Sequence, residues 1–396
     1  MSPFIEALPS RLSGRLVVCV GVYRSGSTWA YNMVQSIIQA ALPTLRIVGH
    51  FAENIEELMP LNLKTCDLVV LKTHPQPALL SLIEFLKPPV ILSVRDPRDC
   101  VASWTQMLGE DFSIFQPRLM RSCGAALRLA GVEYTHTIRY EDGATASVQT
   151  IIDIASHFGL RIPEDRAAAL LKKLSPESVK EQIKQLTDAG RIDRSERLVS
   201  DSKTLWLPEH VGDGRTGKYR ELLSDDQVRS VNCWSRSYCK TFGYDVPAPL
   251  SIPRGTSSLV FGRHSDAVSY LRAGFSFPEA GFTWTNGDEA LVALPLLEPI
   301  SGRMTCEFRY FKPHGIDAPS VKLIIMLLRG TVLIHTVIDA GDGLPVRFDI
   351  DDSRLYGMHE LLFRVAVADP YCPKAYNGGN DDRRLGMALQ GISLTY

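Results

Sequence analysis

Through the first 245 residues, short runs of apolar and β-branched positions alternate with stretches in which apolar residues recur at helical spacing. The apolar runs predict buried strands, which we place at residues 15–20, 67–72, 89–94 and 135–140. The amphipathic stretches predict helices, which we place at residues 29–40, 78–86, 98–108, 144–158 and 165–174. This alternation is typical of an α/β fold in which helices cover both faces of a parallel sheet.

The pattern changes after a Pro-rich segment at residues 246–256, which we interpret as a linker. Beyond it, short apolar or alternating runs are separated by Gly, Asp, Pro and Asn, as in an antiparallel β-sandwich. These predicted strands lie at residues 290–294, 304–310, 321–328, 332–338, 346–350, 361–367 and 387–395. We therefore expect two domains, residues 1–245 and 257–396, as the length of 396 residues also favours.

Composition limits the kinds of partner. The formal net charge of −1 excludes a general attraction to nucleic acid or to an anionic membrane, so an anion site has to be local. The eight cysteines form no CxxC pair and no cluster with histidine, which favours reduced thiols over disulfides or zinc ligands. Because no apolar run is long enough to span a bilayer, we expect a soluble, cytoplasmic protein. Peripheral membrane contact and the oligomeric state stay open.

Residues 20–29 join the first predicted strand to the first predicted helix through a loop rich in hydroxyl groups. Such a turn directs backbone N–H groups and the positive end of a helix at one anionic group, typically a phosphate. Gly21 and Gly26 have the spacing of a nucleotide-triphosphate loop, but Ser27 stands where that motif requires Lys. The cation of this loop is instead Arg24, two positions before the second glycine.

A second anion site is predicted where another strand ends, at the edge of the sheet where parallel sheets bind ligands. Arg95 ends this strand, and Ser103 follows in the first turns of a helix that Pro97 begins. A guanidinium fork and a hydroxyl at a helix start suit a terminal phosphate. The alternative is that Arg95 pairs with Asp96 or Asp99 on the surface.

Two more basic segments carry candidate site residues. Lys72 and His74 follow a strand at the same edge, where a base and a cation at a leaving group are expected, since histidine titrates near neutrality. A glycine-rich loop at residues 210–220 supplies Arg215 and Lys218. Taken alone, such a loop is also typical of a flexible surface segment.

Together and in this order, these motifs resemble the family of sulfotransferases that use 3′-phosphoadenosine-5′-phosphosulfate (PAPS). The resemblance covers residues 15–245 and implies a P-loop-like parallel sheet, PAPS as the donor and no metal. It implies that His74 is the general base and that Lys72 and Arg24 stabilise charge on the bridging oxygen. The donor-binding residues that it implies are Arg24, Ser25, Gly26, Ser27, Thr28, Trp29, Arg95, Ser103, Tyr140, Arg215 and Gly217.

Two departures from the family pattern shape the expectation. The late loop often carries Arg-Lys-Gly where this chain has Gly-Asp-Gly at residues 212–214, so Arg215 is the expected replacement ligand for the 3′-phosphate. Arg24 stands where the small-molecule branch of the family commonly has Lys, and resembles the carbohydrate branch. The second departure favours a carbohydrate acceptor.

The C-terminal part resembles a β-sandwich module attached to bacterial glycosyltransferases and related surface-polysaccharide enzymes, on residues 274–284 and 380–389. The side chains suited to contact a sugar are the aromatic Phe282 and Trp284 and the polar Asp382 and Arg383. Packing in the core is the favoured alternative for all four, because aromatic residues at strand spacing are usually buried.

The predicted function is transfer of a sulfuryl group from PAPS to a hydroxyl of an acceptor, most consistent with a bacterial carbohydrate or glycolipid. One alternative is a nucleotide-dependent kinase of related fold, against which the missing Lys after Gly26 argues. The other is a catalytically silent glycan-binding protein, which would have no need for the five residues Arg24, Lys72, His74, Arg95 and Ser103 together.

Overall fold

The computed structural model describes residues 9–61, 64, 66–109, 112–192, 200–208, 211–263, 265–276, 278–312, 322–329, 331–338, 345–377, 381 and 383–396. The chain divides into two compact units, residues 1–223 with 238–244 and residues 224–237 with 245–396. The predicted domain boundaries and linker stay predictions. Within the described ranges, no helix is both long and apolar enough to cross a membrane. All eight cysteines are free, as the sequence predicts.

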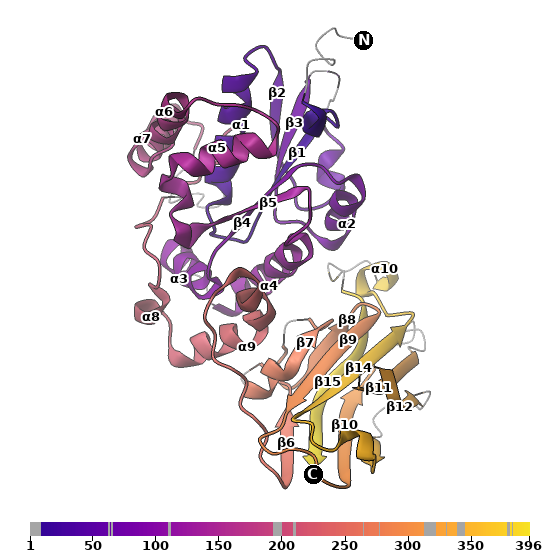
Figure 1. Ribbon diagram of the computed structural model, residues 1–396. Coiled ribbons are helices and arrows are strands. Elements are labelled where there is room, and N and C mark those ends of the chain that lie inside the picture. Colours follow the sequence, from indigo (N-terminus) through magenta and orange to yellow (C-terminus); the bar gives the residue numbers. More distant parts are fainter. Residues whose placement is uncertain are drawn as a thin grey trace. The chain divides into compact units, whose positions relative to one another are not determined.

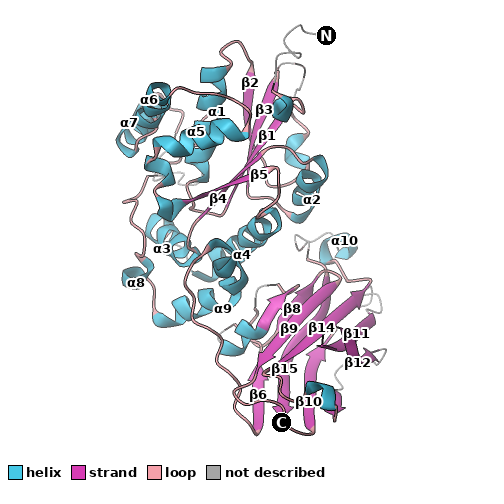
Figure 2. Cartoon of the chain, in the orientation of Figure 1, coloured by secondary structure: helices cyan, strands magenta, loops and turns pink. Residues whose placement is uncertain are grey.

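A parallel sheet with the strand order β2-β3-β1-β4-β5 forms the centre of the first unit (Figures 1 and 2). Its strands are β1 (Leu16–Gly21), β2 (Ile47–Phe51), β3 (Leu68–Thr73), β4 (Val90–Val94) and β5 (Thr135–Arg139). The four predicted strands are confirmed, and β2 is an addition. Gly49 and His50 interrupt the apolar run of β2, and as an edge strand it is only half-buried, so its sequence lacks the buried-strand pattern.

Helices cover both faces of this sheet, as predicted. Figure 1 shows α1 and α5 on one side and α2 and α4 on the other. The helices are α1 (Ser27–Ala41), α2 (Pro77–Leu86), α3 (Pro97–Leu108), α4 (Phe112–Leu129), α5 (Val148–His157), α6 (Glu164–Lys173), α7 (Pro176–Asp188), α8 (Tyr219–Leu222) and α9 (Asp225–Phe242).

Three details of the helices differ from the sequence prediction. The predicted helix at 144–158 is a 3₁₀ turn at Ala144–Ala146 followed by α5, because the Ser147 side chain accepts a hydrogen bond from the backbone N–H of Thr150 and caps α5. Helices α4 and α7 were not predicted. Both carry apolar residues at helical spacing, such as Val179 and Ile183 in α7, although Pro117 lies inside α4 and α7 is polar over most of its length.

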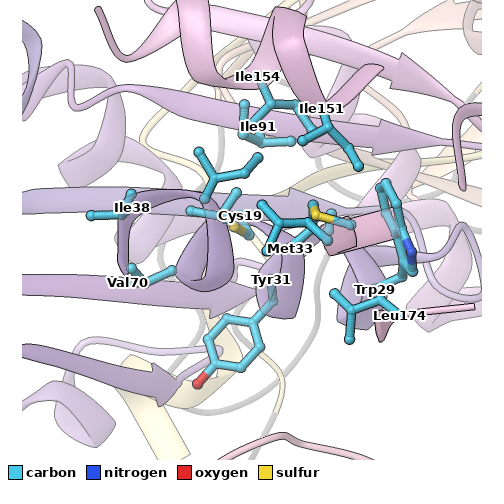
Figure 3. Close-up of a cluster of buried hydrophobic side chains, with 14 of the residues drawn as sticks. Cys19, Trp29, Tyr31, Met33, Ile38, Val70, Ile91, Ile151, Ile154 and Leu174 are labelled. Atoms are coloured by element: carbon cyan, nitrogen blue, oxygen red, sulfur yellow. The ribbon is translucent and has the colours of Figure 1, made fainter. Parts of the chain in front are cut away.

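The core of this unit fixes α1 against the sheet. Figure 3 shows side chains of α1 between those of the sheet and those of α5. Tyr31, Met33 and Ile38 of α1 are fully buried, and burial of each such side chain stabilises the fold by roughly 1.5–3 kcal/mol. Trp29, in the first turn of α1, lies near Leu174 at one end of this cluster. Because α1 is held this firmly, the loop before it has a defined position.

The second unit contains two antiparallel sheets. One has the strand order β13-β10-β15-β6, with β8 also paired to β15, and the other has the order β12-β11-β14-β9-β7. The strands are β6 (Thr256–Val260), β7 (Leu271–Ala273), β8 (Thr283–Asn286), β9 (Glu289–Pro295), β10 (Met304–Phe311), β11 (Lys322–Arg329), β12 (Thr331–Ile338), β13 (Val346–Ile350), β14 (Glu360–Ala368) and β15 (Leu385–Thr395), with the short helix α10 (Pro373–Asn377). Phe308 of β10 and Phe363 of β14 meet with ring centroids 5.0 Å apart, so the sheets share one core. The predicted β-sandwich is confirmed.

The proposed sugar contacts of this unit are engaged inside it. The Phe282 ring lies edge-on to Phe311 at 4.7 Å between centroids, and Trp284 lies edge-on to the same ring at 5.3 Å. Arg383 pairs with Asp381 at 2.7 Å and with Glu279 at 3.2 Å. These contacts support the packing alternative, and Asp382 lies outside the described residues.

Candidate active site

The predicted motifs meet at one edge of the parallel sheet. In the register of the sheet, Val20 of β1 lies beside Thr73 of β3, and Gly21 lies beside Ser93 of β4. The loops that leave β3 and β4 therefore each begin about one strand spacing, roughly 4.8 Å, from the loop that leaves β1 between them. This edge is where parallel sheets bind their ligands.

The loop after β1 turns sharply into α1. Arg24 and Gly26 both have left-handed backbone conformations, with φ of 65° and 83°. Between them, the buried hydroxyl of Ser25 lies 2.6 Å from the carbonyl oxygen of Val22 and 3.0 Å from that of Ser93. Ser25 thus points into the sheet and holds the loop. The predicted role of Ser25 as a donor ligand stays a prediction, and its hydroxyl is engaged within the protein.

The turn leaves α1 to begin at the ligand edge. The first backbone N–H groups of an α-helix have no partner inside the helix, and the helix end is partly positive. The side chains of Ser27 and Thr28 are buried there and line a cavity of about 880 Å³. Ten of the predicted site residues line this cavity: Arg24, Gly26, Ser27, Thr28, Trp29, Lys72, His74, Arg95, Ser103 and Tyr140.

His74 is oriented by its neighbours. Its Nδ1 lies 2.6 Å from the carbonyl oxygen of Gly21, which can only accept a hydrogen bond, so Nδ1 carries the proton. The other nitrogen, Nε2, lies 3.3 Å from Nζ of Lys72 and is left as an acceptor in the cavity. Burial and the charge of Lys72 hold the pKa of His74 well below 6.5. A neutral imidazole with an unprotonated Nε2 is the form that a general base requires.

A second layer holds this histidine. The ring of Tyr23 stacks on His74 with centroids 3.9 Å apart, and the Tyr23 hydroxyl donates a hydrogen bond to Glu53. Glu53 follows β2 and also lines the cavity. Its charge raises the pKa of Lys72, but burial has the larger effect and lowers that pKa to about 8. Neither Tyr23 nor Glu53 was predicted as a site residue. Glu53 was missed because β2, which it follows, was not recognised, whereas Tyr23 lies in the predicted loop after β1, where the predicted ligands begin at Arg24.

The two predicted anion sites form one continuous site. Nε of Arg24 donates to the hydroxyl of Ser103 at 3.1 Å, and Nη1 of Arg95 donates to the carbonyl oxygen of Arg24, also at 3.1 Å. The Arg95 guanidinium lies 4.2 Å from the centroid of the Tyr140 ring. The surface-pair alternative for Arg95 is wrong. Arg95 is 4% exposed, and although it approaches Asp99 at 4.0 Å, that contact is buried.

The late loop brings a different cation to the cavity from the predicted one. Arg215 is more than half exposed, pairs with Asp213 and Glu221, and does not line the cavity. Lys218 lines the cavity instead and is buried, with Nζ 2.9 Å from Gln106 and 3.3 Å from Asp213. The ligand role of Arg215 stays a prediction, and Lys218 is the cation of this loop that lines the cavity.

Gly217 forms a hydrogen bond within the protein. Its backbone N–H donates to Asp99 at 2.6 Å, and Asp99 also accepts from the backbone N–H of Tyr219 at 3.1 Å. Gly217 does not line the cavity, and its assignment as a donor ligand stays a prediction. Asp99 anchors the late loop to α3.

The cavity holds an excess of positive charge. Among the described residues that line it, seven are cationic and three are acidic: Arg24, Lys72, Arg95, Arg118, Arg121, Lys180 and Lys218, against Glu53, Glu177 and Asp213. Burial and the neighbouring charge of Arg95 lower the pKa of Arg24 to about 10. The repulsion that a neighbouring cation exerts on Arg24 would be relieved by an anionic ligand.

No group of three or more possible metal-ligating side chains occurs in the described part of the chain. The expected absence of a metal stays a prediction. Arg118, Arg121 and Lys180 were not predicted as site residues, because α4 and α7, which carry them, were not predicted.

Searches against protein-family models and against curated proteins find no match. Similar solved structures include mouse sulfotransferase SULT7A1 complexed with PAP, with 13% identity, a TM-score of 0.42 and coverage of 60% of this chain and 88% of that one. They also include retinol dehydratase in complex with androsterone and the inactive cofactor PAP, with 17% identity, a TM-score of 0.41 and coverage of 62% and 85%.

The C-terminal portion is similar to carbohydrate-binding modules. One is the C-terminal CBM6 of LamC from Zobellia galactanivorans, with 16% identity, a TM-score of 0.23 and coverage of 36% of this chain and 99% of that one.

Proposed function

We propose that this protein is a sulfotransferase that moves a sulfuryl group from PAPS to a hydroxyl of an acceptor, and that the acceptor is a carbohydrate or glycolipid. The observation that carries the proposal is the arrangement of His74. A backbone carbonyl fixes the tautomer of this histidine, and its unprotonated Nε2 lies 3.3 Å from Nζ of Lys72 in a cation-rich cavity that Arg24 also lines. A positioned base and positioned cations are the two groups that sulfuryl transfer requires.

The cavity fits a nucleotide with two anionic ends. At one end, Ser27, Thr28 and the first turn of α1 suit the 5′-phosphosulfate. At the other end, Arg95 and Ser103, with Lys218 nearby, suit the 3′-phosphate. Trp29 lines the cavity, and its buried Nε1 has no partner among the described residues. Its ring and its N–H group are therefore both available to the adenine ring of the nucleotide.

The proposed chemistry is an in-line displacement at sulfur. His74 takes the proton of the acceptor hydroxyl at Nε2 while the acceptor oxygen forms its bond to sulfur. The bond between sulfur and the bridging oxygen breaks, and Lys72 and Arg24 neutralise the negative charge that this oxygen gains. The products are a sulfate ester and 3′,5′-adenosine bisphosphate (PAP), and the proton leaves His74 to water.

Two measurements test this proposal. Calorimetry with PAP tests the donor site, and transfer of labelled sulfate from PAPS to a panel of glycans and small alcohols tests the reaction. We expect PAP to bind, and we expect His74→Ala to keep PAP binding but to lose at least about 100-fold in turnover, the usual contribution of a general base. The matched control is His50→Ala, a histidine of β2 that does not line the cavity. Absence of PAP binding would overturn the proposal.

The same samples separate the alternatives. Turnover of ATP with Mg²⁺ in place of PAPS would support the kinase. PAP binding without sulfate transfer to any member of the panel, unchanged by His74→Ala, would support a silent binding protein. The carbohydrate class rests on Arg24 and on the attached β-sandwich, and the panel of glycans and small alcohols tests it separately.

A further inference from the structure

Two arginines in the cavity have no task in holding the donor. Arg118 and Arg121 lie three positions apart on α4, so their side chains leave the same face of the helix, with Cβ atoms about 5–6 Å apart. Both line the cavity, Arg118 exposed and Arg121 half-buried. No described residue forms a hydrogen bond or an ion pair with either guanidinium.

These arginines belong to the side of the cavity where the acceptor hydroxyl has to lie. The same face of α4 carries Phe115, whose ring is edge-on to Tyr23 at 5.9 Å, and Ser122, whose hydroxyl accepts from the backbone N–H of Tyr23 at 3.4 Å. Tyr23 in turn stacks on His74. Helix α4 thus packs against Tyr23, the residue that stacks on the proposed base, whereas Trp29 and Tyr140 of the proposed nucleotide end come from other elements.

Electrostatic effects agree with this position. Burial raises the pKa of the Tyr23 hydroxyl, and the charges of Arg121 and Arg118 act against that rise. Burial, then Lys72, and then more weakly Arg121 lower the pKa of His74. The carboxylate on this side, Glu53, is already bonded to Tyr23. Positive charge beside the base is therefore in excess even after Lys72 is assigned to the donor.

From this excess we infer that the acceptor is anionic, namely a saccharide that carries a carboxylate or another acidic group close to the hydroxyl that receives the sulfuryl group, held by Arg118 and Arg121. The inference rests on the proposed sulfotransferase function and names its acceptor class. Arginine forks bind carboxylate and sulfate oxygens in pairs, so two of them at this spacing orient such a group as well as attract it. With a neutral acceptor, both guanidiniums would be hydrated and would have no anionic partner in the complex.

The test compares matched acceptors on PAP-saturated protein. A panel of neutral disaccharides is titrated by calorimetry against the same disaccharides with one C6 hydroxymethyl group oxidised to a carboxylate. We expect the uronates to bind about tenfold or more tightly at low salt, in line with one or two charged hydrogen bonds in a partly exposed site. This preference should shrink as salt rises to about 1 M, because the arginines are partly exposed.

Variants assign the preference to this pair. In the double variant Arg118→Gln with Arg121→Gln, we expect the uronate preference to fall to less than about twofold while PAP affinity stays unchanged. Arg128→Gln is the control, because it removes a positive charge of the same kind from the same helix at a position that pairs with Glu84 and does not line the cavity. It should keep the preference.

Three results would overturn the inference: equal binding of neutral and oxidised disaccharides, a preference that survives in the double variant, or binding of no member of the panel. Failure of the proposed function has a different signature, which is loss of PAP binding by the unaltered protein. In that event the uronate titration is run without PAP and still reports on the arginine pair.

Discussion

Substitution of Gly21 by alanine should disturb the whole site through a single methyl group. Gly21 is the last residue of β1, and a Cβ atom built there would lie 2.3 Å from Cβ of Ser27 and 2.6 Å from Oγ of Ser93. Carbon atoms in contact prefer about 3.5–4.0 Å, so the start of α1 or β4 has to move by on the order of 1 Å. The backbone of Gly21 is displaced by the same overlap, and with it the carbonyl group that orients His74.

The size of the effect follows from this displacement. Overpacking of this kind destabilises a protein by about 1–3 kcal/mol, which corresponds to a fall in the unfolding temperature of several degrees. Misplacement of catalytic groups by about 1 Å costs on the order of 100-fold in rate. We therefore expect Gly21→Ala to lose about 100-fold in labelled-sulfate transfer and to bind PAP more weakly.

Thermal unfolding by circular dichroism, calorimetry with PAP and labelled-sulfate transfer measure these quantities. The matched control is Gly14→Ala, since a Cβ there meets no atom within 4 Å and the position is exposed. The control should change the free energy of unfolding by less than about 0.5 kcal/mol. A Gly21→Ala protein with unaltered stability, PAP affinity and turnover would refute the claim that close packing at Gly21 sets the geometry of the site.

Three other predictions concern separate parts of the molecule. Lys72 is charged below its pKa of about 8, so kcat/KM should fall as pH rises through about 8. Lys72→Arg should move this alkaline fall of the pH profile to higher pH, and a fall that stays in place would exclude Lys72 as its source. Asp99→Asn weakens the anchor of Gly217 and should raise the Kd of PAP about tenfold in calorimetry, whereas an unchanged Kd would mean that the late loop does not contribute to donor binding. Phe363→Ala removes a fully buried ring from the sandwich core and should destabilise that unit by about 3–5 kcal/mol in denaturant unfolding. PAP affinity should stay the same, because all residues that line the cavity belong to the other unit. A matching loss of PAP affinity would contradict this separation.

The sequence alone determined the parts of the fold that depend on short-range pattern. Strands β1, β3 and β4 are short apolar runs. Two residues determine the start of α3: the side chain of Asp96 caps the helix, and Pro97 is its first residue. Because parallel strands place their carboxyl ends at one edge, the pattern also predicted that their loops would share a site. The edge strand β2 lacks such a pattern. Helices α4 and α7 do carry apolar residues at helical spacing, but the internal Pro117 of α4 and the polar majority of α7 make the pattern less evident, and the residues that these elements contribute were missed.

Only the tertiary structure decided which side chains of each loop face the cavity. Ser25 and Ser27 are equivalent as hydroxyl groups in the sequence, yet Ser25 bonds to Ser93 of a neighbouring strand and Ser27 faces the cavity. Arg215 and Lys218 are two cations of one loop, and surface acids hold the first while the second is buried in the cavity wall. The direction of a loop side chain depends on backbone dihedrals and on partners far away in the chain, and local spacing carries neither.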